Sequence, residues 1–377
     1  MTVPNHRTWV EISLPRIAAN YHALRAATAP NSQLAPVVKA DAYRHGAAAV
    51  ALCLQAEGAR WFAVSNTQEG VELRQSGVTA RILVMGDLLH YELDALAHAQ
   101  LTPVVHSLSR LRDINAFAAA CGLSIAYHLK IDTGMGRLGT RNSPDEILQA
   151  IRDASHTRLE GLMTHLASAN DFTSPQTSDQ IVAFEAAVHQ LSQASLTPPL
   201  LHLSSSAPVA FQMRRAYGNL IRPGLALYGY VSPPYGDAPP VTLDVQPALT
   251  WKARIVEIKD IPKNCPVGYG AQWRAPRNTR VAVVAAGYAD GIPHQLSNRG
   301  HVIANGKLLP MLGAVSMDLI TVDVTDAPPI HIGDPVTLLG TGGAVKYDAQ
   351  DMAAEAGIIS YAVLCGLGNR VARVYID

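Results

Sequence analysis

Short apolar runs recur along the first part of the chain, and longer stretches with helical features separate them. The runs are almost continuously apolar, which is typical of strands buried on both faces. Eight such runs in about 230 residues predict a (β/α)8 barrel, with a doubly wound parallel sheet as the alternative. The runs are residues 34–38, 61–64, 81–85, 102–105, 125–131, 159–164, 200–203 and 219–225.

Helix-start signals lie between these runs. Ser143-Pro144-Asp145-Glu146 combines an N-cap serine, a proline at the first helical position and a glutamate three residues after the cap. This combination predicts a helix that begins after Ser143. Asn66-Thr67-Gln68-Glu69 resembles a second capping box, and Gly77 would end that helix. Residues 180–194 have helical periodicity.

The pattern changes near residue 232. Residues 232–240 have the composition of a linker, and short β-type runs follow at 253–258, 281–285, 302–304, 319–324 and 335–339. Asn305-Gly306 between two apolar runs predicts a hairpin. The chain is therefore predicted to be an α/β protein. A TIM-like (β/α)8 barrel would span 1–240 and a mostly antiparallel β domain 241–377, and the first few residues could join the β domain.

Composition narrows the class of protein. The 377 residues have a formal net charge of zero, which gives no footprint for nucleic acid or an anionic membrane. No apolar stretch is long enough to span a bilayer, and residues 1–6 lack the apolar core of a signal peptide. The four cysteines are far apart, so we expect buried thiols in a reducing cytoplasm. No cysteine or histidine pattern predicts a metal site.

Residues that follow the strands of a barrel face its active site. Lys39 follows the first run, and a lysine in an apolar pocket or near other cations becomes a base and a Schiff-base former. A surface lysine after a strand is the other interpretation. Ser206, Gly224 and Leu225 follow the last two runs, whose loops often bind phosphate in barrels. A reactive lysine with a phosphate cradle favours pyridoxal 5'-phosphate (PLP) as cofactor.

Several motifs resemble those of the alanine racemase family, PLP enzymes of fold type III, over nearly the whole chain and in the family's order. Separate motifs in sequence are far more specific than a single one. The motifs are Val38-Lys39-Ala40-Asp41-Ala42-Tyr43-x-His45-Gly46, Asp132-Thr133-Gly134-Met135-Gly136-Arg137-Leu138-Gly139, Thr164-His165, Ile221-Arg222-Pro223-Gly224-Leu225, Val267-Gly268-Tyr269-Gly270-Ala271, Gly287-Tyr288-Ala289-Asp290-Gly291 and Ser316-Met317-Asp318.

The resemblance implies racemisation of L- and D-alanine by two bases. Lys39 would carry PLP and act on one face, and Tyr269 would act on the other face in the barrel of the partner subunit. The functional unit would be a head-to-tail homodimer with shared active sites. Tyr43, His165, Ser206, Arg222, Gly224, Leu225 and Tyr361 would bind PLP, Arg137 and the Met317 backbone would bind the substrate carboxylate, and Lys130 matches a lysine that is often carbamylated.

Each residue alone has a simpler interpretation. Tyr269 could be a packed loop aromatic, Arg222 and Arg137 structural ion-pair partners, and Lys130 the partner of a carboxylate. His165 could be a satisfied core histidine, and residues 204–206 only a helix cap. Their occurrence together at successive strand ends favours the functional interpretation.

The chain departs from the family at the substrate entrance, to which Tyr288 also belongs. Ala314 stands where an arginine is usual, and His294 lies near where another is common. Asn170 stands where an aspartate is usual. Loss of two arginines would widen and neutralise the entrance, so a racemase of broader specificity, with serine as the nearest candidate, is the alternative. A PLP-dependent decarboxylase and a non-catalytic PLP carrier are weaker alternatives.

Overall fold

The computed structural model describes residues 5–377, and these residues form two compact units. The first unit comprises residues 16–42 and 47–246, and the second comprises 5–15, 43–46 and 247–377. The expected lack of a signal peptide concerns residues 1–6, of which 1–4 lie outside the described residues. Within the described part of the chain, every helix is too short or too polar to cross a membrane.

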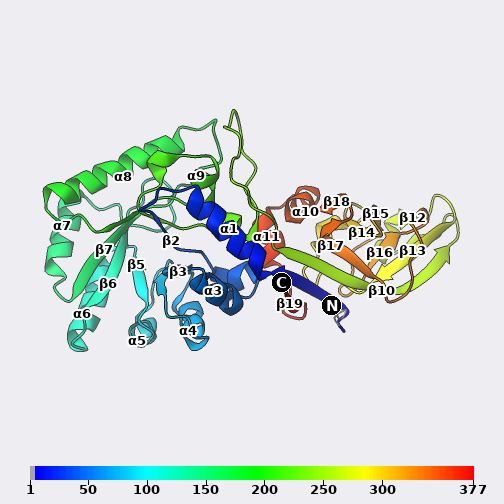
Figure 1. The fold of residues 1–377 in the computed structure, drawn as a ribbon, viewed down its shortest axis with the longest axis horizontal. Helices are drawn as coiled ribbons and strands as arrows, with labels where there is room; N and C mark the ends of the chain where they lie inside the picture. The colour runs from blue at the N-terminus through cyan, green and yellow to red at the C-terminus, as the bar shows by residue number, and fades with distance from the viewer. Residues whose placement is uncertain (1–4) are drawn as a thin grey trace. The chain divides into compact units, whose positions relative to one another are not determined.

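The first unit is built on a ring of parallel strands (Figure 1). Strands β3 to β8 each pair with the next strand in the chain, and β2 pairs with β9. Val38 N donates to Ala63 O at 2.9 Å, which joins the β2 segment to β3. Asn219 N donates to Leu201 O at 2.9 Å, which joins β8 to the β9 segment. The strands are β2 (Gln33–Leu34), β3 (Trp61–Val64), β4 (Arg81–Val84), β5 (Thr102–Val105), β6 (Ile125–Lys130), β7 (Thr157–Met163), β8 (Leu200–His202) and β9 (Leu220–Ile221).

The ring confirms the predicted (β/α)8 barrel and excludes a doubly wound sheet, which would have free edges. Two predicted runs are strands only in part. In the run 34–38, Pro36 lacks an N–H group, and the strand ends before it. In the run 219–225, the strand ends at Ile221, two residues before Pro223. The residues after that proline form a 3-10 helix, η3 (Leu225–Tyr228).

Helices lie around these strands (Figure 1). The predicted cap before α7 is confirmed, since the Ser143 hydroxyl accepts from Glu146 N and the Glu146 carboxylate accepts from Ser143 N at 2.8 Å. The helices of this unit are α1 (Leu14–Ala26), α3 (Ala47–Ala56), α4 (Thr67–Gln75), α5 (Leu93–His98), α6 (Leu108–Ala120), α7 (Pro144–Asp153), α8 (Gln176–Gln193) and α9 (Ser206–Ala210), with short 3-10 turns η1 (His90–Glu92) and η2 (Arg214–Ala216).

A left-handed helical turn follows the first strand. In α2 (Lys39–Arg44), φ lies between 52° and 66° from Ala40 to Arg44, although none of these residues is glycine. For L-residues this backbone costs roughly 1–2 kcal/mol per residue, so other groups must stabilise it. Asp41 Oδ1 accepts from Ala47 N at 2.8 Å, which ties the turn to the start of α3.

Glu69 stabilises the start of the same turn and corrects the predicted capping box. Asn66 does cap α4, because its side chain accepts from Glu69 N at 2.9 Å. The Glu69 carboxylate, however, does not return to Asn66. It accepts from Ala40 N at 2.8 Å and from Ser65 N at 2.7 Å. The acidic residue at the helix start therefore fixes the backbone beside Lys39.

The second unit is mainly antiparallel. Its strands β10, β13, β16, β15, β14 and β17 pair in that order, and β17 pairs again with β10, which closes this sheet as well. Asn305 and Gly306 have φ of 46° and 75° in the β14–β15 turn, so the predicted hairpin is confirmed. The unit contains β1 (Thr8–Ser13), β10 (Leu249–Ile261), β11 (Pro266–Val267), β12 (Trp273–Arg274), β13 (Thr279–Val284), β14 (His301–Ala304), β15 (Lys307–Leu312), β16 (Ile320–Asp323), β17 (Pro335–Gly342), β18 (Val345–Tyr347), β19 (Ala372–Ile376), α10 (Ala349–Ala356), α11 (Ser360–Cys365), η4 (Tyr269–Ala271) and η5 (His294–Leu296).

The cysteines differ from expectation. None of the four cysteines forms a disulfide, and none is fully buried; they are Cys53, Cys121, Cys265 and Cys365. Cys121 is exposed because it lies at the C-terminal end of α6, where the helix meets solvent.

Candidate active site

Cationic side chains meet at the carboxyl end of the barrel strands. Lys130 ends β6, His165 follows β7 and Arg222 follows β9. Burial, together with the charges of Arg137 and Arg222, lowers the pKa of Lys130 to about 8. Burial likewise lowers the pKa of His165 to about 3, with added repulsion from Arg222, Lys130, Arg137 and Lys39. The site therefore holds excess positive charge that suits an anionic ligand, and His165 is neutral there.

Arg222 is buried and almost completely hydrogen-bonded. Its Nη1 donates to His202 Nδ1 at 2.8 Å and to the His202 carbonyl at 3.0 Å. Its Nη2 donates to the carbonyls of Thr164 at 2.9 Å and Leu203 at 3.2 Å, and lies 3.4 Å from His165 Nδ1. Among the described residues, none accepts from its Nε. The guanidinium is thus held rigidly, with one N–H left for a ligand.

Ser206 collects backbone donors at the start of α9. Its hydroxyl accepts from Gly224 N at 3.0 Å and from Ala226 N at 3.1 Å. Ser205 is the N-cap residue of α9 but makes no side-chain cap hydrogen bond, and Ser206 is the first residue of the helix. A hydroxyl beside converging N–H groups fits a phosphate ester.

The loop that carries Arg137 is shaped by Asp132. Asp132 Oδ1 accepts from the backbone N of Gly134, Met135 and Gly136 at 2.9 to 3.1 Å. Its Oδ2 pairs with Arg141 Nε at 2.8 Å. Arg137 itself is exposed. The loop therefore presents a guanidinium to solvent on a fixed backbone.

The remaining predicted site residues belong to the second unit. Tyr43 is buried and its ring lies 6.0 Å from that of Tyr361, while the Tyr288 and His294 rings lie 6.3 Å apart. Tyr269 is 76% exposed, and Met317 is 53% exposed. An aromatic side chain so exposed is not packed in its own chain, so the interpretation of Tyr269 as a packed loop residue is wrong.

Two pairs of loops in this unit lie against each other. Tyr288 N donates to Ser316 O at 3.0 Å, which joins the loop of Tyr288 to the loop of Met317. A Cβ on Gly268 would lie 3.1 Å from Ala314 N, so the loop of Tyr269 lies against residue 314. The structure thus places Tyr288 beside the loop of Met317, and Ala314 beside the loop of Tyr269.

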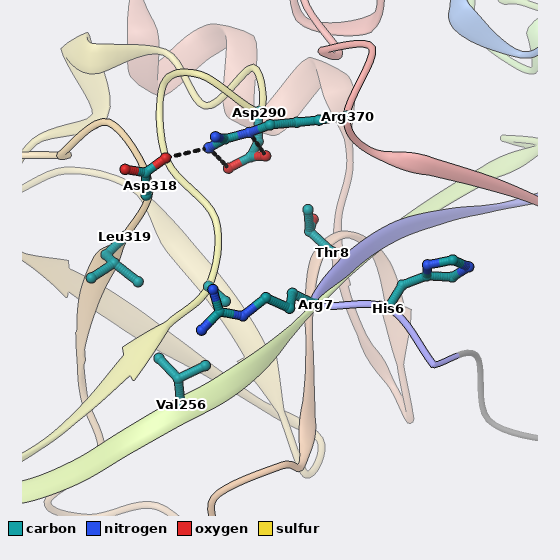
Figure 2. Close-up of a pocket in the computed structure, with 9 residues that line it drawn as sticks. His6, Arg7, Thr8, Val256, Asp290, Asp318, Leu319 and Arg370 are labelled. Atoms are coloured by element: carbon teal, nitrogen blue, oxygen red, sulfur yellow. Dashed lines mark hydrogen bonds and ion pairs between the residues drawn. The ribbon is translucent and has the colours of Figure 1, made fainter.

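Arg370 contacts the loop of Met317 through an ion pair with the neighbouring Asp318. It pairs with Asp290 at 2.6 Å and with Asp318 at 2.7 Å (Figure 2). These residues line a cavity of about 540 Å³ together with His6, Arg7, Thr8, Val256, Ala285 and Leu319. No predicted PLP-binding residue lines this cavity, so it is not the site that the sequence predicts. Arg370 was not recognised in the sequence, where it follows a glycine-rich turn.

Within the first unit the structure brings together Arg222, His165 and Lys130. It also adds residues that sequence reasoning missed, among them Glu69, Asp132 as the organiser of a loop, and His202. Asn170 is partly buried, and its amide donates to Pro233 O at 2.9 Å.

Comparison with known proteins matches both units to one family. Residues 12–233 match the family described as "Alanine racemase, N-terminal domain", and residues 248–375 match "Alanine racemase, C-terminal domain". An alanine racemase of Halothermothrix orenii is 36% identical over 371 residues, which cover 98% of this chain and 96% of that protein.

Solved structures of alanine racemases are similar to this chain over almost its whole length. The alanine racemase of Streptomyces coelicolor A3(2) superposes with a TM-score of 0.93 at 32% identity, with 98% of each chain covered. A structure of alanine racemase from Bartonella henselae with covalently bound pyridoxal phosphate has a TM-score of 0.88 at 28% identity, and covers 98% of this chain and all of that one.

Proposed function

Because the chain belongs to the alanine racemase family, we propose that it interconverts L- and D-alanine with PLP as its cofactor. The Bartonella henselae relative carries covalently bound pyridoxal phosphate, and the residues here fit that group. Lys39 would bind it covalently. As the family resemblance implies, its phosphate would be held by Tyr43, Ser206, Gly224, Leu225 and Tyr361. The single observation that carries the proposal is the fixed Arg222 with one free N–H in a cationic site.

The arrangement of Arg222 suits racemisation. When bound, the coenzyme withdraws electrons from the Cα of the amino acid and makes its hydrogen acidic. Arg222 keeps its proton at neutral pH, although burial lowers its pKa to about 9. Its Nε would therefore donate to the pyridine nitrogen without protonating it. Electron withdrawal stays moderate, which favours prompt return of a proton to Cα.

Racemisation requires proton transfer on both faces of one carbon, because a single base tends to return the proton to the face it left. We assign Lys39 Nζ to one face and Tyr269 Oη to the other. Both groups have reference pKa values near 10, so the cations Arg137 and Arg222 would help Tyr269 to act as a base. These cations would be contributed by the barrel that Tyr269 serves.

The substrate carboxylate would be bound by Arg137 and by the Met317 backbone N–H. The pKa of Lys130 is lowered to about 8, so at pH 7 a minor fraction of the molecules, roughly a tenth, carries an uncharged amine. An uncharged amine can react with carbon dioxide to give a carbamate, whose negative charge would then orient Arg137.

Exposure of Tyr269 and Met317 supports a head-to-tail homodimer. Large apolar or aromatic side chains that are exposed together usually mark an interface. In such a dimer each β domain would supply its Tyr269 and Met317 to the barrel of the other subunit. We also assign the enzyme to the cytoplasm, on the basis of its four cysteines, none of which forms a disulfide.

Ala314 supports a second candidate, a racemase of broader specificity. It lies beside the loop of Tyr269, where a small neutral side chain leaves space that an arginine would fill. Serine is then the nearest additional substrate, because it adds only a hydroxyl to alanine.

The decisive experiment is a racemisation assay of the PLP-loaded protein with L- and D-alanine and a panel of other amino acids. Enantiomers have equal free energy, so we expect either enantiomer of alanine to reach an equal mixture. Racemisation of serine at a comparable rate would favour broader specificity. Release of carbon dioxide would instead indicate a decarboxylase, and an absorbance band of PLP without any turnover would indicate a carrier.

A further inference from the structure

A line of polar side chains continues from Arg222 through the barrel. Arg222 Nη1 lies 2.8 Å from His202 Nδ1, and His202 Nε2 lies 2.8 Å from His128 Nδ1. His128 Nε2 faces Glu160 Oε2 at 3.6 Å. Glu160 in turn accepts both Nη groups of Arg81. His128, His202, Glu160 and Arg222 are each at most 6% exposed.

These contacts cross the interior of the barrel. His128 lies on β6 and His202 on β8, with β7 between them, while Arg81 on β4 reaches Glu160 on β7 past two strands. Side chains of strands that are not neighbours can meet in this way only inside the ring. Barrel interiors are usually filled by branched apolar side chains, and buried ionisable groups are unfavourable unless they are paired. The buried polar side chains inside this barrel therefore indicate a functional role in addition to packing.

The hydrogen bonds of this line have one direction. A guanidinium only donates, so His202 Nδ1 must accept and its proton must lie on Nε2. His202 Nε2 then donates to His128 Nδ1, which leaves the proton of His128 on Nε2, opposite the Glu160 carboxylate. In the reverse direction a neutral His202 would carry its proton on Nδ1, where it would face the N–H of Arg222. Both rings are neutral, in agreement with burial, which lowers the pKa of each.

The carboxylate of Glu160 is the negatively charged group at the end of this line of hydrogen-bonded side chains. Burial alone would raise the pKa of its carboxyl, but contacts with His128 and Arg81 outweigh burial and hold the pKa below its usual range. Among the described residues His128 Nε2 makes no hydrogen bond, and the Glu160 carboxylate 3.6 Å away is the charged group that faces it. Gly161 makes room for the ring, since a Cβ there would come within 2.6 Å of it.

We propose that Glu160 is a positioning residue for the active site, which acts through His128 and His202 to hold the guanidinium of Arg222 in place. This inference rests on the proposed function, because it concerns how Arg222 meets the pyridine nitrogen. The carboxylate favours the His128 tautomer that accepts from His202, and that tautomer leaves His202 Nδ1 free to accept from Arg222. Arg222 Nη1 is then hydrogen-bonded to His202, and Arg222 Nε stays available for a ligand.

The alternative is that Glu160 merely pairs with Arg81 and Arg158 at the far end of the barrel. The Arg81 side chain is 44% exposed and that of Arg158 is 60% exposed, so both ion pairs reach solvent. The two alternatives differ in what happens at Arg222 when the carboxylate is replaced by an amide.

The test is Glu160→Gln in the PLP-loaded enzyme. If the new amide turns its NH2 group to His128 Nε2, that nitrogen must accept, and the proton of His128 moves to Nδ1. His202 must then carry its proton on Nδ1, where it opposes the N–H of Arg222 Nη1. We expect kcat for alanine to fall roughly tenfold to a hundredfold, as a small displacement of a binding group does. KM should stay within about twofold, because Arg137 is untouched. The ¹⁵N shifts of His128 and His202 should change, and so should the visible absorption band of bound PLP.

Arg158→Gln is the matched control, since Arg158 contacts the same carboxylate at 3.3 Å from its solvent side. It should leave kcat, the ¹⁵N shifts and the absorption band as they are in the unmodified enzyme. If Glu160→Gln does not fold, Gly161→Ala displaces the His128 ring without removing any charge, and we expect it to lower kcat and change the ¹⁵N shifts of His202.

Unchanged kcat, absorption and ¹⁵N shifts in the folded Glu160→Gln or Gly161→Ala enzyme would overturn the inference. Failure of the proposed function is a different result, because the unmodified enzyme would then not racemise alanine. The ¹⁵N shifts of its histidines would still report whether the line of hydrogen bonds has the inferred direction.

Discussion

At the scale of single residues, the two proposed bases differ in their exposure to solvent. Lys39 is partly buried beside cations, whereas Tyr269 is largely exposed on its own chain. A lysine is activated by such surroundings, but an exposed phenol is not. In the proposed dimer, Tyr269 would therefore depend on groups supplied by the partner subunit, and the two residues should respond differently to substitution.

Lys39→Ala should abolish covalent attachment of PLP, because no other amine would occupy this position. The absorption band of the bound coenzyme should disappear after dialysis, and racemisation should fall below detection. Lys252→Ala, which removes a lysine from a partly buried ion pair with Glu11, is the control and should keep both. Retention of covalent PLP by Lys39→Ala would show that another residue is the attachment site.

Tyr269→Phe should retain PLP but lose most turnover, since it removes only the hydroxyl. The loss should be greater for α-hydrogen exchange from L-alanine than from D-alanine, measured by deuterium incorporation from D2O. Tyr235→Phe, at another exposed tyrosine, provides the control. Equal and near-normal exchange of both enantiomers by Tyr269→Phe would contradict the assignment of two bases.

At the scale of elements, the left-handed turn and the barrel strands could be predicted to different degrees. The strand positions, the cap of α7 and the β14–β15 hairpin follow from local signals in the sequence. The left-handed turn does not, because Ala40 and its neighbours are not residues that favour positive φ. The line through His128 and His202 was missed because each lies in an apolar run, and their meeting depends on closure of the ring.

Ala40→Val should test the turn. A β-branched side chain is strongly disfavoured at positive φ, and Ala40 is exposed, so no packing is lost. We expect the free energy of unfolding to fall by about 1–2 kcal/mol, measured by urea denaturation of the PLP-loaded enzyme. Ala95→Val, at an exposed position of the right-handed helix α5, should cost only about 0.5 kcal/mol. Equal effects of the two substitutions would argue against a strained turn.

The buried histidines predict how stability depends on pH. Burial lowers the pKa of His128, His165 and His202, so the folded state binds fewer protons than the unfolded state below pH 6.5. The free energy of unfolding should therefore fall as the pH falls, by about 1 kcal/mol for each histidine between pH 7 and 5.5. Urea denaturation at both pH values measures this. His202→Gln should reduce the difference, and greater stability at pH 5.5 would contradict the prediction.

At the scale of the whole molecule, the two units have separate sequence signals. Their folds were predictable because each has its own strand pattern. Which subunit completes which site was implied only by the family resemblance, because local sequence patterns do not distinguish a residue that serves its own chain from one that serves a partner. Tyr269 shows this, since its exposure became visible only in the structure.

Mixing of two inactive variants should decide the question. In a head-to-tail dimer of one Lys39→Ala chain and one Tyr269→Ala chain, one site lacks both bases and the other has both. After the subunits are unfolded together and refolded with PLP, random pairing should restore about a quarter of the activity of the unmodified enzyme. Two copies of either variant alone are the control. No recovery would place Tyr269 in the site of its own chain.

The left-handed turn also has a consequence for the order of assembly. An isolated segment has no reason to adopt this backbone, so the turn persists only when Glu69 and the start of α3 are already in place. Lys39 is therefore presented correctly only by a finished barrel. A newly synthesised chain should therefore bind the aldehyde of PLP only after the barrel has folded. Partly folded chains would then not be trapped as covalent adducts at Lys39.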